Sequence, residues 1–190
     1  MNNNDILIRI RYAFDIKETD VVKIFQMGGM EFSKEEIQKM LIKPKDEGYK
    51  KDTRTGTYFQ SDDTEESTES SKKDDIYRCN NRMLEAFLEG FIIFNRGVKK
   101  VDPSEPESSQ KTSHAVINNT NVNNVVLKKL KIALSLSSED MLAIFEEAGA
   151  SLSKGELSAL FRKEGHRNYK EAQDSNIKFF LKGLALRHRK

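Results

Sequence analysis

The chain has 190 residues, of which 37% are hydrophobic and 33% are charged, and its formal net charge at pH 7 is +2. No run of 18 or more apolar residues occurs, which argues against a membrane-spanning helix, and the first residues do not have the pattern of a secretory signal. Cys79 is the only cysteine, which excludes an internal disulfide framework and favours a reduced, cytoplasmic setting.

An internal repeat organises the sequence. With a shift of 120 positions, residues 3–51 align with residues 123–171 without a gap, and fourteen of the 49 pairs are identical. The alignment resumes at a shift of 93, where residues 87–91 match residues 180–184. Because most other apolar positions also stay apolar, both copies have the same helical pattern. We predict an all-α protein built from two tandem copies of a unit of about four helices, with no sheet.

The repeat divides the chain into a first unit (1–97), a linker (98–122) and a second unit (123–190). The first unit is longer by 27 residues, and the extra residues fall around 52–75, where eight acidic residues oppose three basic ones. This segment is rich in Ser and Thr and has few apolar residues, so it cannot bury enough surface to offset its ordering entropy. We therefore expect a disordered acidic insertion there.

In the second unit either of two neighbouring asparagines can cap the first helix, and the pair is repeated in the first unit. These are Asn3 and Asn4 in the first unit, and Asn123 and Asn124 in the second. In the second unit this helix is expected to run to about residue 136. It is apolar on two faces, because Val125 and Ile132 lie nearly opposite its main stripe and Tyr12 takes the place of Ile132 in the first unit. Such a helix is usually buried between layers, so we expect the units to pack on each other with pseudo-two-fold symmetry.

The second helix is expected over about 139–148 in the second unit. Gly29 and Gly149 follow it in the two units, where a left-handed residue ends a helix. Gly28 is replaced by Ala148, which indicates that one glycine is enough at this turn. The third helix opens in both units with a capping box, in which a serine is followed three residues later by a glutamate. The two boxes are Ser33 with Glu36 and Ser153 with Glu156.

The fourth helix begins near Asn81 in the first unit and near Asp174 in the second. Gly90 and Gly183 fall in the middle of this helix. A glycine there costs about 1 kcal/mol relative to alanine. Its presence in both units predicts a place where another helix backbone comes close.

Several of these segments carry a family resemblance. Residues 3–12 and 123–131, together with 87–90 and 180–183, resemble the YehS-like family of small bacterial proteins. Members of this family consist of two tandem copies of a domain of unknown function. The resemblance covers both units but not residues 52–75. It implies the two-unit architecture, and it implies no ligand, cofactor or catalytic residue.

Motifs for catalysis are weak in this sequence. A nucleophilic Cys79 would need a histidine nearby, but its counterpart is Ala172, which indicates a small buried residue. The three histidines have no metal-ligand spacing. Residues 27–30 contain two glycines but lack the Gly-Lys-Ser/Thr ending of a phosphate-binding loop. We predict no catalytic residue, no cofactor and no metal.

Three functions stay open, and the membrane is not among the expected partners. The first is a non-enzymatic interaction or regulatory module that binds a protein partner, in an oligomeric state that the sequence leaves open. The second is a nucleic-acid-binding protein, because residues 123–190 carry 13 basic against 8 acidic residues. The second and third helices of each unit could also form a helix-turn-helix, although glutamates at the start of the third helix would repel phosphates. The third is an enzyme of unrecognised type. The candidate nucleic-acid contacts are basic residues of the second unit: Lys128, Lys129, Lys131, Arg187 and Arg189.

Overall fold

The computed structural model describes residues 1–42, 49–51, 58–60, 77–97, 118 and 120–189. The predicted acidic insertion and the predicted linker lie almost entirely outside these residues.

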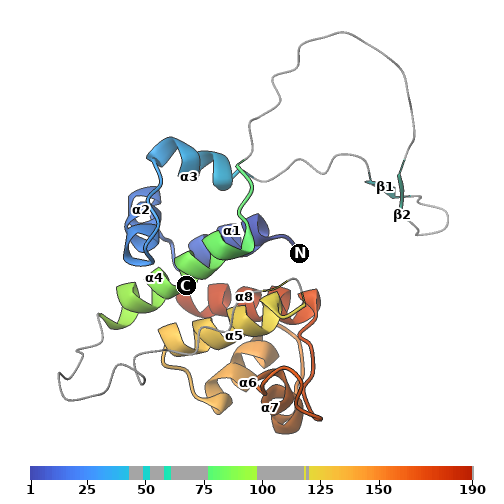
Figure 1. Ribbon diagram of the computed structural model, residues 1–190. Coiled ribbons are helices and arrows are strands. Elements are labelled where there is room, and N and C mark those ends of the chain that lie inside the picture. The colour runs from blue at the N-terminus through green and yellow to red at the C-terminus, as the bar shows by residue number, and fades with distance from the viewer. Residues whose placement is uncertain (43–48, 52–57, 61–76, 98–117, 119, 190) are drawn as a thin grey trace.

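The described residues contain eight helices, four in each unit (Figure 1). The first unit contains α1 (Asn3–Ala13), α2 (Glu18–Met27), α3 (Lys34–Met40) and α4 (Asn81–Arg96). The second unit contains α5 (Val122–Ala133), α6 (Ser138–Glu147), α7 (Lys154–Leu160) and α8 (Asp174–His188). Each helix of one unit has its counterpart in the same order in the other, so the prediction of two tandem helical units is confirmed.

A small pair of strands departs from the prediction. The strands β1 (Tyr49–Lys51) and β2 (Tyr58–Gln60) pair antiparallel, with Tyr49 opposite Gln60. The expectation of no sheet is therefore wrong in this detail. Tyr58 and Phe59 are residue types that favour strands. The segment around them is mostly acidic and polar, so its average composition does not predict a strand.

The two units pack through their first and fourth helices. Helix α1 packs on α8, and α5 packs on α4. These two contacts are counterparts, because α1 corresponds to α5 and α4 corresponds to α8. In Figure 1 the four helices lie together between the outer helices of each unit. A single cluster of buried apolar side chains extends through both units. The predicted pseudo-two-fold packing is confirmed.

The faces of the first helix are only partly as predicted. Val125 is buried, as expected for a residue at the contact between units. Tyr12 and Ile132, however, are 60% and 38% exposed. The second apolar face is therefore buried at Val125 and open at the position that Tyr12 and Ile132 share.

The mid-helix glycines lie where the second and fourth helices touch. A Cβ at Gly90 would lie 1.7 Å from the carbonyl oxygen of Ile24, and a Cβ at Gly183 would lie 2.1 Å from that of Ile144. The predicted close approach of another backbone is confirmed in both units. Gly28 is also required, since its Cβ would lie 1.9 Å from the carbonyl oxygen of Ala86. The inference that one glycine is enough at this turn therefore fails in the first unit.

The caps of the second and third helices agree with the sequence. Gly29 and Gly149 have positive φ angles of 82° and 89°, as left-handed residues that end α2 and α6. Both predicted capping boxes are present at the start of α3 and α7, with the serine hydroxyl and the glutamate carboxylate each accepting a backbone N–H.

The paired asparagines have another role than the one predicted. They lie inside the helices, and the residues that precede α1 and α5 are Asn2 and Asn121. The Asn4 amide donates to the carbonyls of Met40 at 2.8 Å and Tyr77 at 2.9 Å, and its oxygen accepts from the Cys79 N–H at 3.0 Å.

The second unit repeats this arrangement. Asn124 donates to the carbonyls of Leu160 at 2.8 Å and Lys170 at 2.9 Å, and it accepts from the Ala172 N–H at 2.8 Å. The first asparagines of the pairs bind the start of the fourth helix: Asn3 donates to Asn81 at 2.8 Å, and Asn123 donates to Asp174 at 3.1 Å. The asparagine signature therefore joins the first helix to the end of the third and to the start of the fourth.

Candidate anion-binding pocket

The basic residues predicted to contact nucleic acid are dispersed by the fold, and Lys129 is the clearest case. It is 6% exposed, at the contact between α5 and α4. Its ammonium pairs with the carboxylate of Glu89 and lies 3.7 Å from that of Glu85. A buried ammonium needs such partners because desolvation is costly. The Lys129 ammonium is therefore occupied by carboxylates of the other unit, and its contact with nucleic acid stays a prediction.

The two arginines near the C-terminus are held by side chains of the protein itself. The Arg187 Nε donates to both carboxylate oxygens of Glu147 at 2.9 Å, and this pairing raises the pKa of Arg187. Arg189 lies 3.4 Å from the Asp15 carboxylate, and its guanidinium lies 4.1 Å from the centre of the Tyr12 ring. Lys128 is exposed on α5. The five predicted residues therefore do not form one surface.

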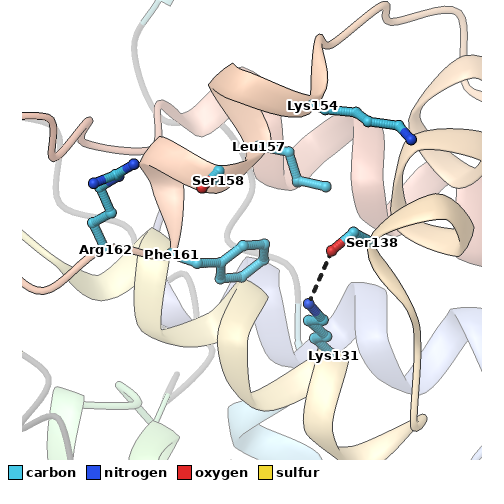
Figure 2. A pocket seen from close by; sticks show the side chains of 7 residues that line it. All are labelled: Lys131, Ser138, Lys154, Leu157, Ser158, Phe161 and Arg162. Carbon is cyan, nitrogen blue, oxygen red and sulfur yellow. Dashed lines mark hydrogen bonds between the residues drawn. The ribbon is translucent and has the colours of Figure 1, made fainter.

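Lys131 borders a pocket between the first three helices of the second unit (Figure 2). The pocket has a volume of about 310 Å³. Its lining combines the end of α5, the start of α6 and one side of α7 with the residues after it: Lys131, Ser138, Lys154, Leu157, Ser158, Phe161 and Arg162. It thus brings together three cationic side chains, two hydroxyls, an aromatic ring and an aliphatic side chain.

The Lys131 ammonium is the cation directed at this pocket. It lies 3.4 Å from the Ser138 hydroxyl and 5.0 Å from the centre of the Phe161 ring. An ammonium over an aromatic face is attracted by the ring quadrupole, so Phe161 holds Lys131 in place. In Figure 2 the Lys131 and Ser138 side chains face each other, with the Phe161 ring beside them.

The other two cations lie at opposite sides of the rim in Figure 2. Lys154 lies 3.4 Å from the Glu139 carboxylate. The pKa of Glu139 is lowered first by a hydrogen bond from the backbone amide of Glu139 itself and then by Lys154. Arg162 has its guanidinium 3.4 Å from the His166 ring. The rim therefore adds positive charge, which is partly offset beside Lys154.

The corresponding place in the first unit has a different composition. Ser138 corresponds to Glu18, whose carboxylate lies 3.9 Å from the Arg11 guanidinium and accepts a hydrogen bond from the Gln38 amide at 2.9 Å. Arg11 and Gln38 are the counterparts of Lys131 and Ser158. The first unit therefore has a carboxylate where the second unit has a hydroxyl.

Sequence reasoning missed this pocket. The charge of Lys131 makes it a candidate from the sequence, whereas Ser138, Ser158 and Phe161 carry no charge and belong to no binding motif. The aligned repeats do contain a signal, since Glu18 is replaced by Ser138 and Ile42 by Arg162. Both replacements remove negative charge or add positive charge. Their meaning becomes clear only when three helices are placed around one point.

The structure also explains Cys79, the candidate nucleophile, and the apolar helices. Cys79 is buried beside the start of α4, and burial raises the pKa of its thiol to about 12. A thiol in that environment is a poor nucleophile. None of the described helices is both long and apolar enough to cross a bilayer.

The fold and the pocket together define a class: an all-helical tandem-repeat protein whose two units share a core and differ at one polar surface. A family model described as "Protein of unknown function (DUF1456)" matches residues 3–97 and 123–190. The chain belongs to this family.

A curated bacterial relative supports the same assignment. The chain is 34% identical over 188 residues to "Uncharacterized protein YehS" of Escherichia coli (strain K12), covering 98% of this chain and 96% of that protein. The resemblance drawn from the sequence is therefore confirmed. No solved structure matches the chain significantly.

Proposed function

We propose that this protein is a non-enzymatic interaction or regulatory module, and that its second unit binds an acidic segment of a protein partner. The observation that carries the proposal is the position of the Lys131 ammonium, held by Phe161 and Ser138 at the edge of a pocket between three helices. A fixed cation next to an aromatic ring and hydroxyl groups provides charge, hydrogen bonds and apolar contact in one place. Protein interfaces use this combination for their central contacts.

The electrostatics of the surroundings favour a protein segment over nucleic acid. Asp140 and Glu156 lie in the first turns of α6 and α7. Hydrogen bonds from Ser137 lower the pKa of Asp140, and those from Ser153, followed by Lys170, lower the pKa of Glu156. Both carboxylates are therefore charged at neutral pH. A run of phosphates would meet them, whereas a peptide can place one acidic side chain at Lys131 and keep the rest away.

We also infer that this interaction takes place in the cytoplasm. Cys79 is a buried free thiol, and unpaired cysteines are typical of reducing compartments.

The proposal is tested by affinity purification from the native host after nuclease treatment, with wild type, Lys131→Glu and Lys128→Glu as baits. Lys128→Glu is the matched control, because Lys128 is exposed on the same helix and does not line the pocket. We expect a protein partner that resists nuclease, is retained by Lys128→Glu and is lost with Lys131→Glu. Circular dichroism should show that each variant is folded.

Two results would contradict the proposal. Loss of all bound material after nuclease treatment would favour nucleic-acid binding. A protein partner that binds Lys131→Glu as well as wild type would show that the pocket is not its site.

A further inference from the structure

The first unit provides an internal reference for the pocket of the second. Its Glu18, at the start of α2, joins three helices: the carboxylate meets Arg11 of α1 at 3.9 Å and Gln38 of α3 at 2.9 Å. Because the units share their fold, the same point in the second unit lies between α5, α6 and α7. This is where the pocket lies.

The substitutions among the residues that line the pocket remove negative charge or add positive charge, whereas Glu139, which stands in place of Thr19 beside Lys154, adds a carboxylate outside the lining. The cation of the first helix is kept, as Lys131 in place of Arg11. The carboxylate is lost, because Ser138 stands in place of Glu18. A further cation is added at the rim, where Arg162 replaces Ile42.

The described contacts of Lys131 agree with this reading. They are to the Ser138 hydroxyl and the Phe161 ring, and no carboxylate among the residues that the structure describes takes the part that Glu18 plays for Arg11. A half-buried ammonium gains from a carboxylate, since hydrogen bonds to charged groups are stronger than those between neutral groups.

We infer that the pocket of the second unit receives a carboxylate from outside, at the place where the first unit has its own Glu18. The inference rests on the proposed function and names the group that the partner supplies: the side chain of a glutamate or aspartate. Lys131 pairs with this carboxylate, the hydroxyls of Ser138 and Ser158 donate to it, and the Phe161 ring packs against the methylene groups of the same side chain.

A carboxylate fits this place better than a phosphate. The reference group in the first unit is a singly charged carboxylate held by one cation and one neutral donor. At the rim of the pocket, Lys154 also has the Glu139 carboxylate 3.4 Å away. A phosphate with nearly two negative charges would meet more repulsion there than a single carboxylate does.

The test is a heteronuclear NMR titration with a short peptide that carries one glutamate among neutral residues, compared with the same peptide carrying glutamine at that position and with inorganic phosphate. We expect the glutamate peptide to perturb the amides around Lys131 and Phe161 and to bind about tenfold more tightly than the glutamine peptide, a difference of about 1.4 kcal/mol. The Ser138→Glu variant should lose this binding about tenfold or more, because its own carboxylate occupies the place.

The matched control is Ser175→Glu, which adds a carboxylate to the first turn of α8, away from the pocket lining. It should bind the peptide as wild type does. Equal binding of the two peptides, tighter binding of phosphate, or no effect of Ser138→Glu in a folded variant would overturn the inference.

These outcomes are separable from those of the proposed function. If a protein partner depends on Lys131 but the glutamate peptide does not bind, the carboxylate assignment is wrong and the interaction site stands. If capture of the partner is independent of Lys131, the proposed function itself is wrong.

Discussion

The two units of this protein keep the same interior and differ on one surface. The buried asparagines and the mid-helix glycines make equivalent contacts in both: Asn4 with Asn124, and Gly90 with Gly183. At the meeting point of the first three helices, Glu18 provides a carboxylate in the first unit, whereas in the second unit Ser138 lines a pocket. The fold needs the buried asparagines and the mid-helix glycines in both copies. Glu18 and Ser138 are not under this constraint, so this is where the units can differ in what they bind.

A second difference lies between the units. Lys129 forms a buried ion pair with Glu85 and Glu89 where α5 meets α4. In the counterpart contact of α1 with α8, the matching positions are Arg9, Lys178 and Lys182, which are all basic and exposed. The two halves of the interface are therefore equivalent in backbone and different in charge. We interpret the buried ion pair as a device that favours one arrangement of the units over its alternatives.

The largest effect is expected where the units are most alike. Gly183→Leu should destabilise the protein by at least about 3 kcal/mol, because the new side chain would meet the backbone of Ile144. Gly90→Leu should cost a similar amount. Urea unfolding of the full chain measures both. The control is Gly155→Leu, where a Cβ meets nothing closer than the Ser153 hydroxyl at 4.0 Å; a variant at position 183 as stable as this control would show that the close packing is misread.

The next largest effect is expected from a substitution that removes the charge asymmetry of the interface between the units. Lys129→Met keeps the length of the side chain and removes the ammonium that the Glu85 and Glu89 carboxylates meet. We expect a loss of about 2 kcal/mol, below the roughly 3–5 kcal/mol of a fully buried pair, because Glu85 and Glu89 are partly exposed. Arg9→Met in the counterpart contact should change stability by less than about 0.5 kcal/mol. Equal losses for both variants would contradict the asymmetry.

A smaller effect is expected from a substitution that makes the two units alike at the pocket. Ser138→Glu should stabilise the protein by about 0.5 kcal/mol, because it places a carboxylate in the first turn of α6 and next to Lys131. In a Lys131→Met background most of this gain should disappear, and a thermal melt of the four chains measures the coupling. A gain that is unchanged without Lys131 would mean that the two side chains do not meet.

The smallest expected effect is a change in how the stability of the protein depends on pH. The pKa of Asp140 is lowered by hydrogen bonds from Ser137, so its carboxylate contributes stability above its unfolded pKa of about 4 and loses this contribution as the pH falls through the lower folded value. Asp140→Asn should therefore be less stable than wild type at pH 7, and the two should converge at about pH 2. A difference that persists at low pH would show that packing, and not charge, is responsible.

Local and repeated signals were enough to predict much of this fold. The capping boxes and the left-handed glycines follow from rules that act within a few residues, and the mid-helix glycines stood out because both copies have them. The asparagine pairs fit the local pattern of helix caps, but their buried hydrogen bonds reach residues 36 to 75 positions away. Local rules contain no information on such partners.

The site was harder to predict for the same reason. Lys128, Lys129 and Lys131 look alike as a cluster in the sequence, yet one is exposed, one is buried against the other unit, and one borders a pocket. Rotation around the helix separates them, and the helices packed on each side decide what each one meets. The aligned exchange of Glu18 for Ser138 was visible in the sequence, but only the fold places it opposite Lys131.

The most direct test of the account exchanges these residues between the units. In the double variant Glu18→Ser with Ser138→Glu, the glutamate peptide should no longer perturb the amides around Lys131 and Phe161 in an NMR titration. It should instead perturb those around Arg11 and Gln38, where the exchange opens the equivalent place. Perturbations that stay in the second unit would contradict the claim that a carboxylate at this point closes one unit and that its absence opens the other.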